Sequence, residues 1–247
     1  MTGPTRLANR GGGKPEIVRA LTDALEWLSR HQTGGGCWGV VSNRDDCSAI
    51  SVESVDEWLA LTGLSLLAFV RSGHHHAFGP HAATVRSGIG YLMARQEPSG
   101  QVGASPSTHG LAMLVLCEAY RRTGAQILRG AAQRAIDHAL AARIDSPWMG
   151  PALEAARAGG LNVPRGLTIP LERPDELYPL LLTSFRSGGL AWRDDRAWIE
   201  ELTVELQDRG AGCARGSWRP AFAPQGGRVA ATAIGALLLA LYFNAHP

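Results

Sequence analysis

Apolar residues recur at helical spacing along most of the chain. Ile17, Leu21, Ala24 and Leu28 fall on one face of a predicted helix over residues 15–31. Amphipathic spacing or a long apolar run predicts eight further helices, over residues 55–72, 80–95, 108–122, 126–143, 148–158, 176–186, 194–208 and 228–243. No segment alternates apolar and polar residues over the length of a strand, so we expect an all-α protein with no sheet of consequence.

The predicted helices are of two kinds, amphipathic and apolar nearly all round. The apolar kind carries one shared eight-residue pattern, at residues 62–69, 109–116 and 232–239. Each copy begins with a polar residue, continues with small and apolar residues, and ends in aliphatic ones. A helix that is apolar all round needs neighbours on every side. We therefore expect stacked helical hairpins, with apolar helices inside and amphipathic helices outside.

The loops after the amphipathic helices also repeat. Each has a glutamine, then a glycine, then an apolar residue two positions further on: Gln32-Gly36-Trp38, Gln96-Gly100-Val102 and, with a longer spacer, Gln207-Gly216-Trp218. A glutamine amide can bond the carbonyls at a helix end, and an aromatic ring can stack back on the hairpin. We interpret this pattern as a staple between helices.

These repeats resemble the QW motif of triterpene cyclases and the prenyltransferase repeat, within the squalene-hopene-cyclase-like superfamily. The resemblance is closer to uncharacterised planctomycete-type repeat proteins. It is carried by residues 24–32, 67–74, 108–120, 158–164 and 215–229. It implies an α/α toroid, a ring of inner and outer helices.

The resemblance implies a shortened member of that group, because a short proline-rich link between Pro164 and Tyr178 stands where the group would have further helices. We expect one toroid domain of about nine helices over residues 15–247, preceded by a flexible polar tail at 1–14. The ring is expected to be either open or closed by a tightened interface. An open ring would expose apolar helix flanks, which favours a partner protein or a homodimer.

Charge and hydropathy exclude several classes of partner. The 247 residues include 24 Lys and Arg against 22 Asp and Glu, an excess too small to indicate nucleic-acid binding. The longest apolar run, residues 230–243, is shorter than the ~20 residues needed to span a bilayer. Residues 1–14 lack the apolar stretch of a secretory signal. We therefore expect a cytoplasmic protein without a transmembrane segment, whose four cysteines, at 37, 47, 117 and 213, are free thiols.

The motifs of the related enzymes are absent from the sequence. The chain has no DxDD acid motif, no DDxxD magnesium motif and no Cys-Gly-Glu-Gln thioester. Asp45-x-Cys47 with His109 has the residue types of a protein-prenyltransferase zinc site, but the pair lies much earlier in the chain than in that family. His74-His75-His76 could also bind a metal, although we interpret it as a surface loop. We expect neither a metal nor a cofactor.

The leading hypothesis is a non-catalytic module that binds an apolar small molecule or a protein partner, or serves as a scaffold. The candidate binding residues lie at the starts of the apolar helices and in the long loops: Trp38, Asp45, Asp46, Cys47, His109, Cys117, Trp148, Trp218 and Arg228. For His109 and Cys117 we favour a helix-start hydrogen bond and core packing. The alternative function is an enzyme acting on an isoprenoid, with Asp45 or Asp46 as acid or metal ligand.

Overall fold

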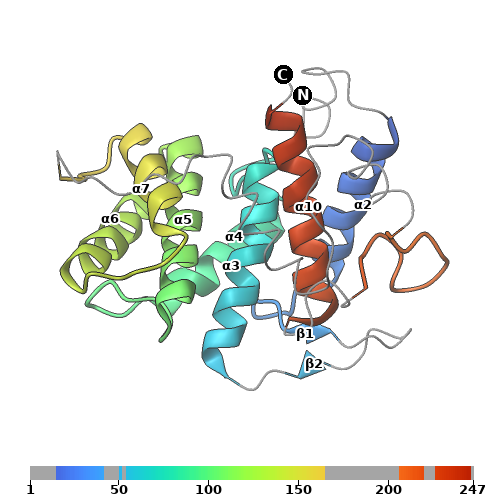
Figure 1. The fold of residues 1–247 in the computed structure, drawn as a ribbon, viewed down its shortest axis with the longest axis horizontal. Coiled ribbons are helices and arrows are strands. Elements are labelled where there is room, and N and C mark those ends of the chain that lie inside the picture. The colour runs from blue at the N-terminus through green and yellow to red at the C-terminus, as the bar shows by residue number, and fades with distance from the viewer. Residues whose placement is uncertain (1–14, 42–49, 52–53, 165–205, 220–225, 246–247) are drawn as a thin grey trace.

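The computed structural model describes residues 15–41, 50–51, 54–164, 206–219 and 226–245. Helices account for most of these residues (Figure 1). Their bounds are α2 (Pro15–Arg30), α3 (Val55–Arg71), α4 (Ala82–Ala94), α5 (Pro106–Thr123), α6 (Gln126–Ala141), α7 (Met149–Ala158) and α10 (Gly227–Ala245). Two strands of two residues each, β1 (Val40–Val41) and β2 (Ile50–Ser51), form an antiparallel pair.

The prediction of an all-α protein is confirmed for the described part of the chain. Seven of the predicted helices are present within a few residues of their expected ends. The predicted helix at 176–186 lies outside the described residues, as does 194–205. Residues 206–208 are described and are not helical, because Gln207 pairs with Trp218 in an isolated β-bridge. The proposed tail, residues 1–14, also lies outside the described part.

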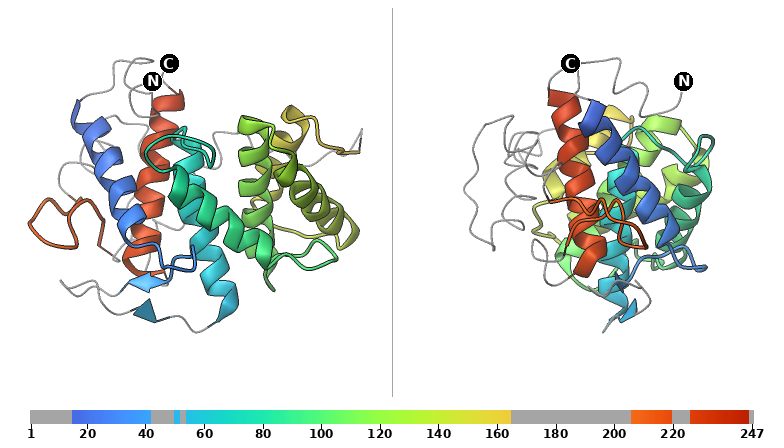
Figure 2. Two further views of the ribbon diagram at one scale, coloured as in Figure 1. Left: turned by 180° about the vertical axis from the view of Figure 1, so that it is seen from behind. Right: turned by 90° about the vertical axis from the view of Figure 1, so that its right-hand side faces the viewer.

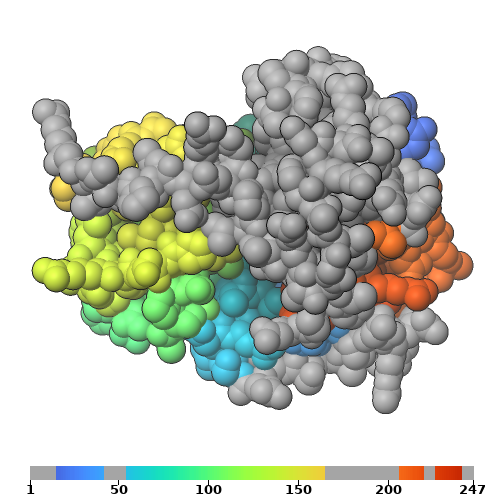
Figure 3. Space-filling view, viewed as in Figure 1, coloured from blue at the N-terminus to red at the C-terminus, as the bar shows by residue number. Residues whose placement is uncertain are grey.

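The helices form two layers that follow the predicted division into apolar and amphipathic kinds. The inner layer is a row in which α10 contacts α3, α3 contacts α5, and α5 contacts α7. The amphipathic helices cover it, with α2 on α10, α4 on α3 and α6 on α5. Figure 2 shows α2 and α10, the first and last described helices, side by side in both views. Figure 3 shows α6 and α7 at one end of the molecule and the loop 206–219 at the other.

Small residues allow the inner helices to pack closely. In α5 the twelve residues from Thr108 to Ala119 are all buried. A side chain at Gly63 of α3 would meet Leu111 of α5 at 3.0 Å, and one at Gly235 of α10 would meet the ring of Trp218 at 2.8 Å. The glycines within the repeated eight-residue pattern are therefore points of close approach between elements.

Three glutamine side chains fasten the loops to the outer helices. Each donates its amide N–H groups to two carbonyls, one in its own loop and one in a different outer helix. Gln32 bonds Gly36 O (2.8 Å) and Thr84 O (2.9 Å); Gln96 bonds Gly100 O (3.1 Å) and Ala131 O (2.9 Å); Gln207 bonds Gly216 O (2.9 Å) and Ala20 O (2.8 Å). The glutamines do bond carbonyls, but the second acceptor lies in a neighbouring outer helix instead of the helix that the glutamine follows.

The third staple runs back to the start of the chain. Gln32 and Gln96 each reach forward, to α4 and to α6 respectively. Gln207 reaches Ala20 in α2, 187 residues earlier. The loop 206–219 is thereby joined to α2, and α10 packs against both α2 and α3.

The loop glycines fit only because they lack a side chain. Gly36, Gly100 and Gly216 have φ values of +85°, +96° and +93°. A Cβ atom on any of them would also collide with a backbone carbonyl of the facing outer helix, at Ser87, Arg134 or Asp23. Each of these carbonyls lies three residues after the one that the glutamine bonds, so all three loops dock in the same way.

The apolar residue after each glycine connects the loop to an inner helix. The backbone N–H of Trp38 donates to Thr62 Oγ1 (3.1 Å), and that of Trp218 donates to Thr232 Oγ1 (3.2 Å). The N–H of Val102 donates to His109 Nδ1 (3.1 Å). The three acceptors are the first residues of the three copies of the eight-residue pattern, so the alignment made from sequence corresponds to one structural position.

The Gln207 staple makes a direct stability prediction. Replacing Gln207 with alanine removes two hydrogen bonds from a buried site and should lower the free energy of unfolding by about 2–3 kcal/mol. Gln101→Ala is the matched control, because its half-buried amide bonds only Gly103 within its own loop. Urea unfolding of both variants measures the difference. Equal losses would contradict the role of the staple.

A second stability prediction concerns the end of α6. Arg143 has φ +50°, in the left-handed region, while Gly73 and Gly160 occupy the corresponding positions after α3 and α7. Arg143→Gly should raise the free energy of unfolding by about 0.5–1 kcal/mol, because glycine adopts this conformation without steric cost. Gly73→Ala should lower it. Thermal unfolding compares the two, and destabilisation by Arg143→Gly would contradict the prediction.

Candidate functional site

Six of the nine candidate binding residues lie in the described part of the chain, and Asp45, Asp46 and Cys47 lie outside it. The six do not converge on one cavity wall. Trp38, His109 and Trp218 lie in or beside three equivalent loop-to-helix joints. Their ligand-binding role stays a prediction, and their structural contacts are as follows.

The two tryptophans of the joints are completely buried. Trp38 donates its indole N–H to Leu28 O at the end of α2 (2.7 Å), and its ring lies against Gly88 of α4. The ring of Trp218 lies against Gly235 of α10. Each ring thus fills the space between a loop and a helix, as the staple interpretation requires.

His109 uses both ring nitrogens to hold neighbouring backbone. Its Nδ1 accepts the N–H of Val102, so the proton resides on Nε2, which donates to Ala135 O of α6 (3.1 Å). Burial lowers the pKa of this imidazole, and the nearby His138 lowers it further, although the Ala135 bond acts in the opposite direction. The neutral ring therefore has no lone pair left for a metal ion. From the first turn of α5, His109 therefore connects the preceding loop with α6.

Cys117 is packed in the core of α5. Burial raises the pKa of its thiol to about 12, with a further contribution from the charge of Glu118. The thiolate is the reactive form of cysteine, so this side chain is unsuited to nucleophilic chemistry at neutral pH.

Trp148 and Arg228 lie at helix starts. Trp148 precedes α7, is half-buried, and lies next to Gly110 of α5. Arg228 opens α10 and is buried; it donates to Ser217 Oγ at 2.9 Å and lies 3.7 Å from the carboxylate of Asp208. Arg228 and Trp218 therefore meet through Ser217 and belong to the same joint.

The expectation of four free thiols is wrong for Cys213. Cys37 and Cys117 are free, whereas Cys213 is disulfide-bonded, and its partner lies outside the described residues. Disulfides persist mainly in oxidising compartments. The cytoplasmic location stays a prediction, and this bond argues against it.

The histidine-rich segment is less exposed than a surface loop should be. His74 is 4% exposed, and its ring centroid lies 4.7 Å from that of His81. Burial lowers the pKa of His74 to about 4, and the charges of His81 and His75 contribute in the same direction. Among the described residues, no group of three or more His, Cys, Asp or Glu side chains is placed to hold a metal ion.

Sequence reasoning missed a cluster of charges at the C-terminal ends of α3 and α5. Glu118, 2% exposed, accepts Arg71 on Oε1 (2.8 Å) and Arg121 on Oε2 (2.7 Å), with Arg122 3.8 Å from Oε2. Glu118 is not among the candidate residues named from the sequence. The available signal was the presence of arginines in the last turns of two apolar helices.

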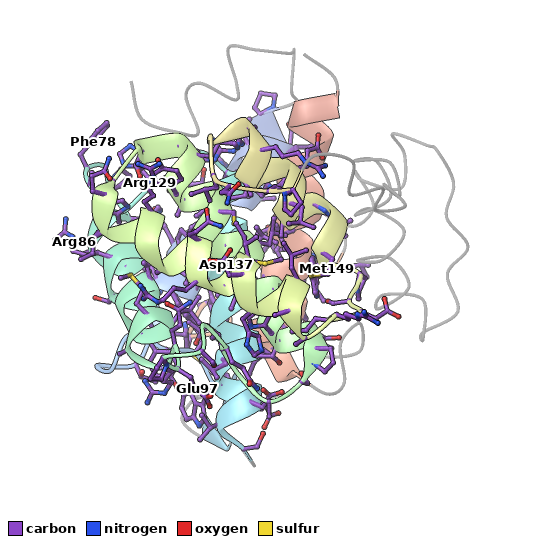
Figure 4. The ribbon with its side chains drawn as sticks, turned by 90° about the vertical axis from the view of Figure 1, so that its left-hand side faces the viewer. Phe78, Arg86, Glu97, Arg129, Asp137 and Met149 are labelled. Atoms are coloured by element: carbon purple, nitrogen blue, oxygen red, sulfur yellow. The ribbon has the colours of Figure 1, made fainter. Side chains whose placement is uncertain are left out.

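A shallow hollow of about 740 Å³ lies on the outer surface beside α6. Figure 4 shows Arg129 and Asp137 along this helix. The side chain of Gln133 crosses the hollow and exchanges two hydrogen bonds with the backbone of Asn162, at 3.0 and 2.8 Å. The residues lining it are Gln126, Arg129, Gly130, Gln133, Asp137, Gly160, Leu161 and Asn162. Its open shape and the internal pairing of Gln133 do not indicate a specific ligand.

Comparison of the chain with protein-family models, curated proteins and solved structures finds no match. The resemblance to terpene-cyclase repeats therefore stays a prediction from sequence. In the described ranges, no helix combines the length and apolar character needed to cross a membrane.

The buried His74 predicts a pH-dependent stability. Its pKa is about 4 in the folded state and about 6.5 in the unfolded chain, so the unfolded state binds more protons between these values. The contribution is complete above pH 6.5 and is lost as the pH falls toward 4. Between pH 7.5 and 5, His74 should account for a loss of about 2 kcal/mol of the free energy of unfolding. Urea unfolding at both pH values should show a smaller loss for His74→Leu, and an equal loss would contradict the prediction.

Proposed function

We propose that this chain is a non-catalytic ligand- or protein-binding module, or a scaffold, of the terpene-cyclase-like superfamily. One observation carries the proposal: the polar groups that could serve chemistry among the described candidate residues are used to hold the hairpins together. General acid–base and nucleophilic catalysis require a group with an available proton, lone pair or thiolate. His109 bonds backbone through both ring nitrogens, and the thiol of Cys117 has a raised pKa.

The proposal includes an α/α toroid of about nine helices. The two-layer order of the described helices supports it, as does the return of the Gln207 staple to α2. A closed ring needs further helices between α7 and α10. The helices predicted at 176–186 and 194–208 would occupy that interval, and they remain predictions from sequence.

Native mass spectrometry of the purified full chain, combined with an activity assay, tests the proposal against the isoprenoid-enzyme alternative. We expect the mass of the chain, or of a dimer, without zinc, and no turnover of isoprenoid diphosphates or squalene. Asp45→Asn and Asp46→Asn should behave like the wild type, and Asp194→Asn is a matched control from the second acidic pair. A product or a bound zinc ion that disappears in Asp46→Asn but persists in Asp194→Asn would overturn the proposal.

A further inference from the structure

One buried carboxylate gathers three guanidinium groups from the ends of two inner helices. Arg71 ends α3, and Arg121 and Arg122 lie in the last turn of α5. All three approach Glu118, whose side chain is 3% exposed, while the arginines themselves are 21%, 35% and 29% exposed. The buried carboxylate therefore anchors the group on its protein side, and each arginine side chain retains surface that reaches solvent.

The positive charge of this cluster exceeds what Glu118 neutralises. Three arginines against one glutamate leave a formal charge of +2. The dipoles of α3 and α5 place about −0.5 elementary charge at each helix C-terminus. This partial negative charge stabilises the arginines there, but the net charge of the cluster stays positive. The pKa of Arg122 is lowered, mainly by burial; Glu118 opposes this effect, and the charges of Arg121 and Arg71 add to it.

The cluster also holds more hydrogen-bond donors than its one acceptor uses. A guanidinium carries five N–H donors in a planar fork. Arg121 directs Nε and Nη2 at Glu118 (3.2 and 2.7 Å), and Arg71 directs Nη2. Arg122 makes the longest contact, 3.8 Å, and has no shorter ion pair with another carboxylate in the described part of the chain. A single buried glutamate would be satisfied by the first two arginines, so the third is not needed for its neutralisation.

We propose that Arg71, Arg121 and Arg122 form an oxyanion site for a phosphate monoester or inorganic phosphate. Guanidinium forks bind phosphate oxygens in pairs, and a tetrahedral oxyanion offers oxygens in more directions than a planar carboxylate. At neutral pH a phosphate monoester carries a charge of about −1.5 to −2, opposite in sign to the formal charge of +2 on the side chains of the cluster. Glu118 is the positioning residue that holds the three guanidiniums together. This site is separate from the candidate residues behind the proposed function, so the two proposals can fail independently.

The test is calorimetric titration of the full chain with inorganic phosphate, phenyl phosphate and acetate, at matched ionic strength and pH 7.5. We expect both phosphates to bind at one site and acetate to bind at least about tenfold more weakly, since it carries half the charge. Tighter binding of phenyl phosphate than of phosphate identifies an ester ligand, and equal binding identifies the free ion; both support the proposal. Lowering the pH to 5.5 should weaken phosphate binding as the second phosphate proton is taken up.

Three variants distinguish a specific phosphate-binding site from general attraction of phosphate to surface charge. Arg122→Gln removes the arginine least engaged with Glu118 and should weaken phosphate binding about tenfold or more. Arg86→Gln makes the same charge change at an exposed arginine of α4 (Figure 4) that bonds only the backbone of His76, and should leave binding unchanged. Arg71→Lys keeps the charge, removes the fork, and provides a second test if Arg122→Gln does not fold. Equal weakening by Arg86→Gln and Arg122→Gln, equal affinity for acetate, or no phosphate binding by the wild type would overturn the proposal.

Discussion

The double hydrogen bond of a loop glutamine is the interaction on which the arrangement of this protein depends. One amide group holds the carbonyl of its own loop and the carbonyl of a different outer helix, and it does so at Gln32, Gln96 and Gln207. The loop can approach that helix only because glycine occupies the point of contact. This docking fixes the following apolar residue, whose N–H then bonds the first residue of the eight-residue pattern in an inner helix. Outer helix, loop and inner helix are therefore positioned together in each repeat.

The third glutamine brings together segments from the two ends of the described sequence. An open solenoid leaves a terminal repeat with one unpaired face at each end. Here the C-terminal joint bonds α2, and α10 packs between α2 and α3, so the two ends of the described chain support one another. This arrangement explains how α10, the most apolar helix, is accommodated. The candidate residues at the joints take part in the same arrangement, because their rings and polar atoms connect the outer helices and loops with the inner helices. The arginines around Glu118, at the opposite ends of α3 and α5, retain donors beyond those that their structural contact uses.

Local patterns in the sequence predicted the helices, their division into two kinds, and the shared loop and helix motifs. The alignment of Thr62, His109 and Thr232 is a local feature of this sort, and the structure gives all three the same hydrogen-bonding position. Contacts between distant segments could not be predicted. The return of Gln207 to Ala20 and the pairing of Arg71 with Glu118 depend on which helices become neighbours. The burial of His74 depends on its packing against Phe69 and His81, which the composition of the loop does not reveal.

Native-state hydrogen exchange of the full chain tests the central claim, that the Gln207 staple joins the C-terminal part of the described chain to α2. If α2 and α10 are joined, their core amides should exchange with the same free energy and the same denaturant dependence as those of α3 and α5, because all four helices open in one cooperative unit. If the staple does not join them, the amides of α2 and α10 will exchange at free energies several kcal/mol lower than those of α3 and α5. That result would contradict the account.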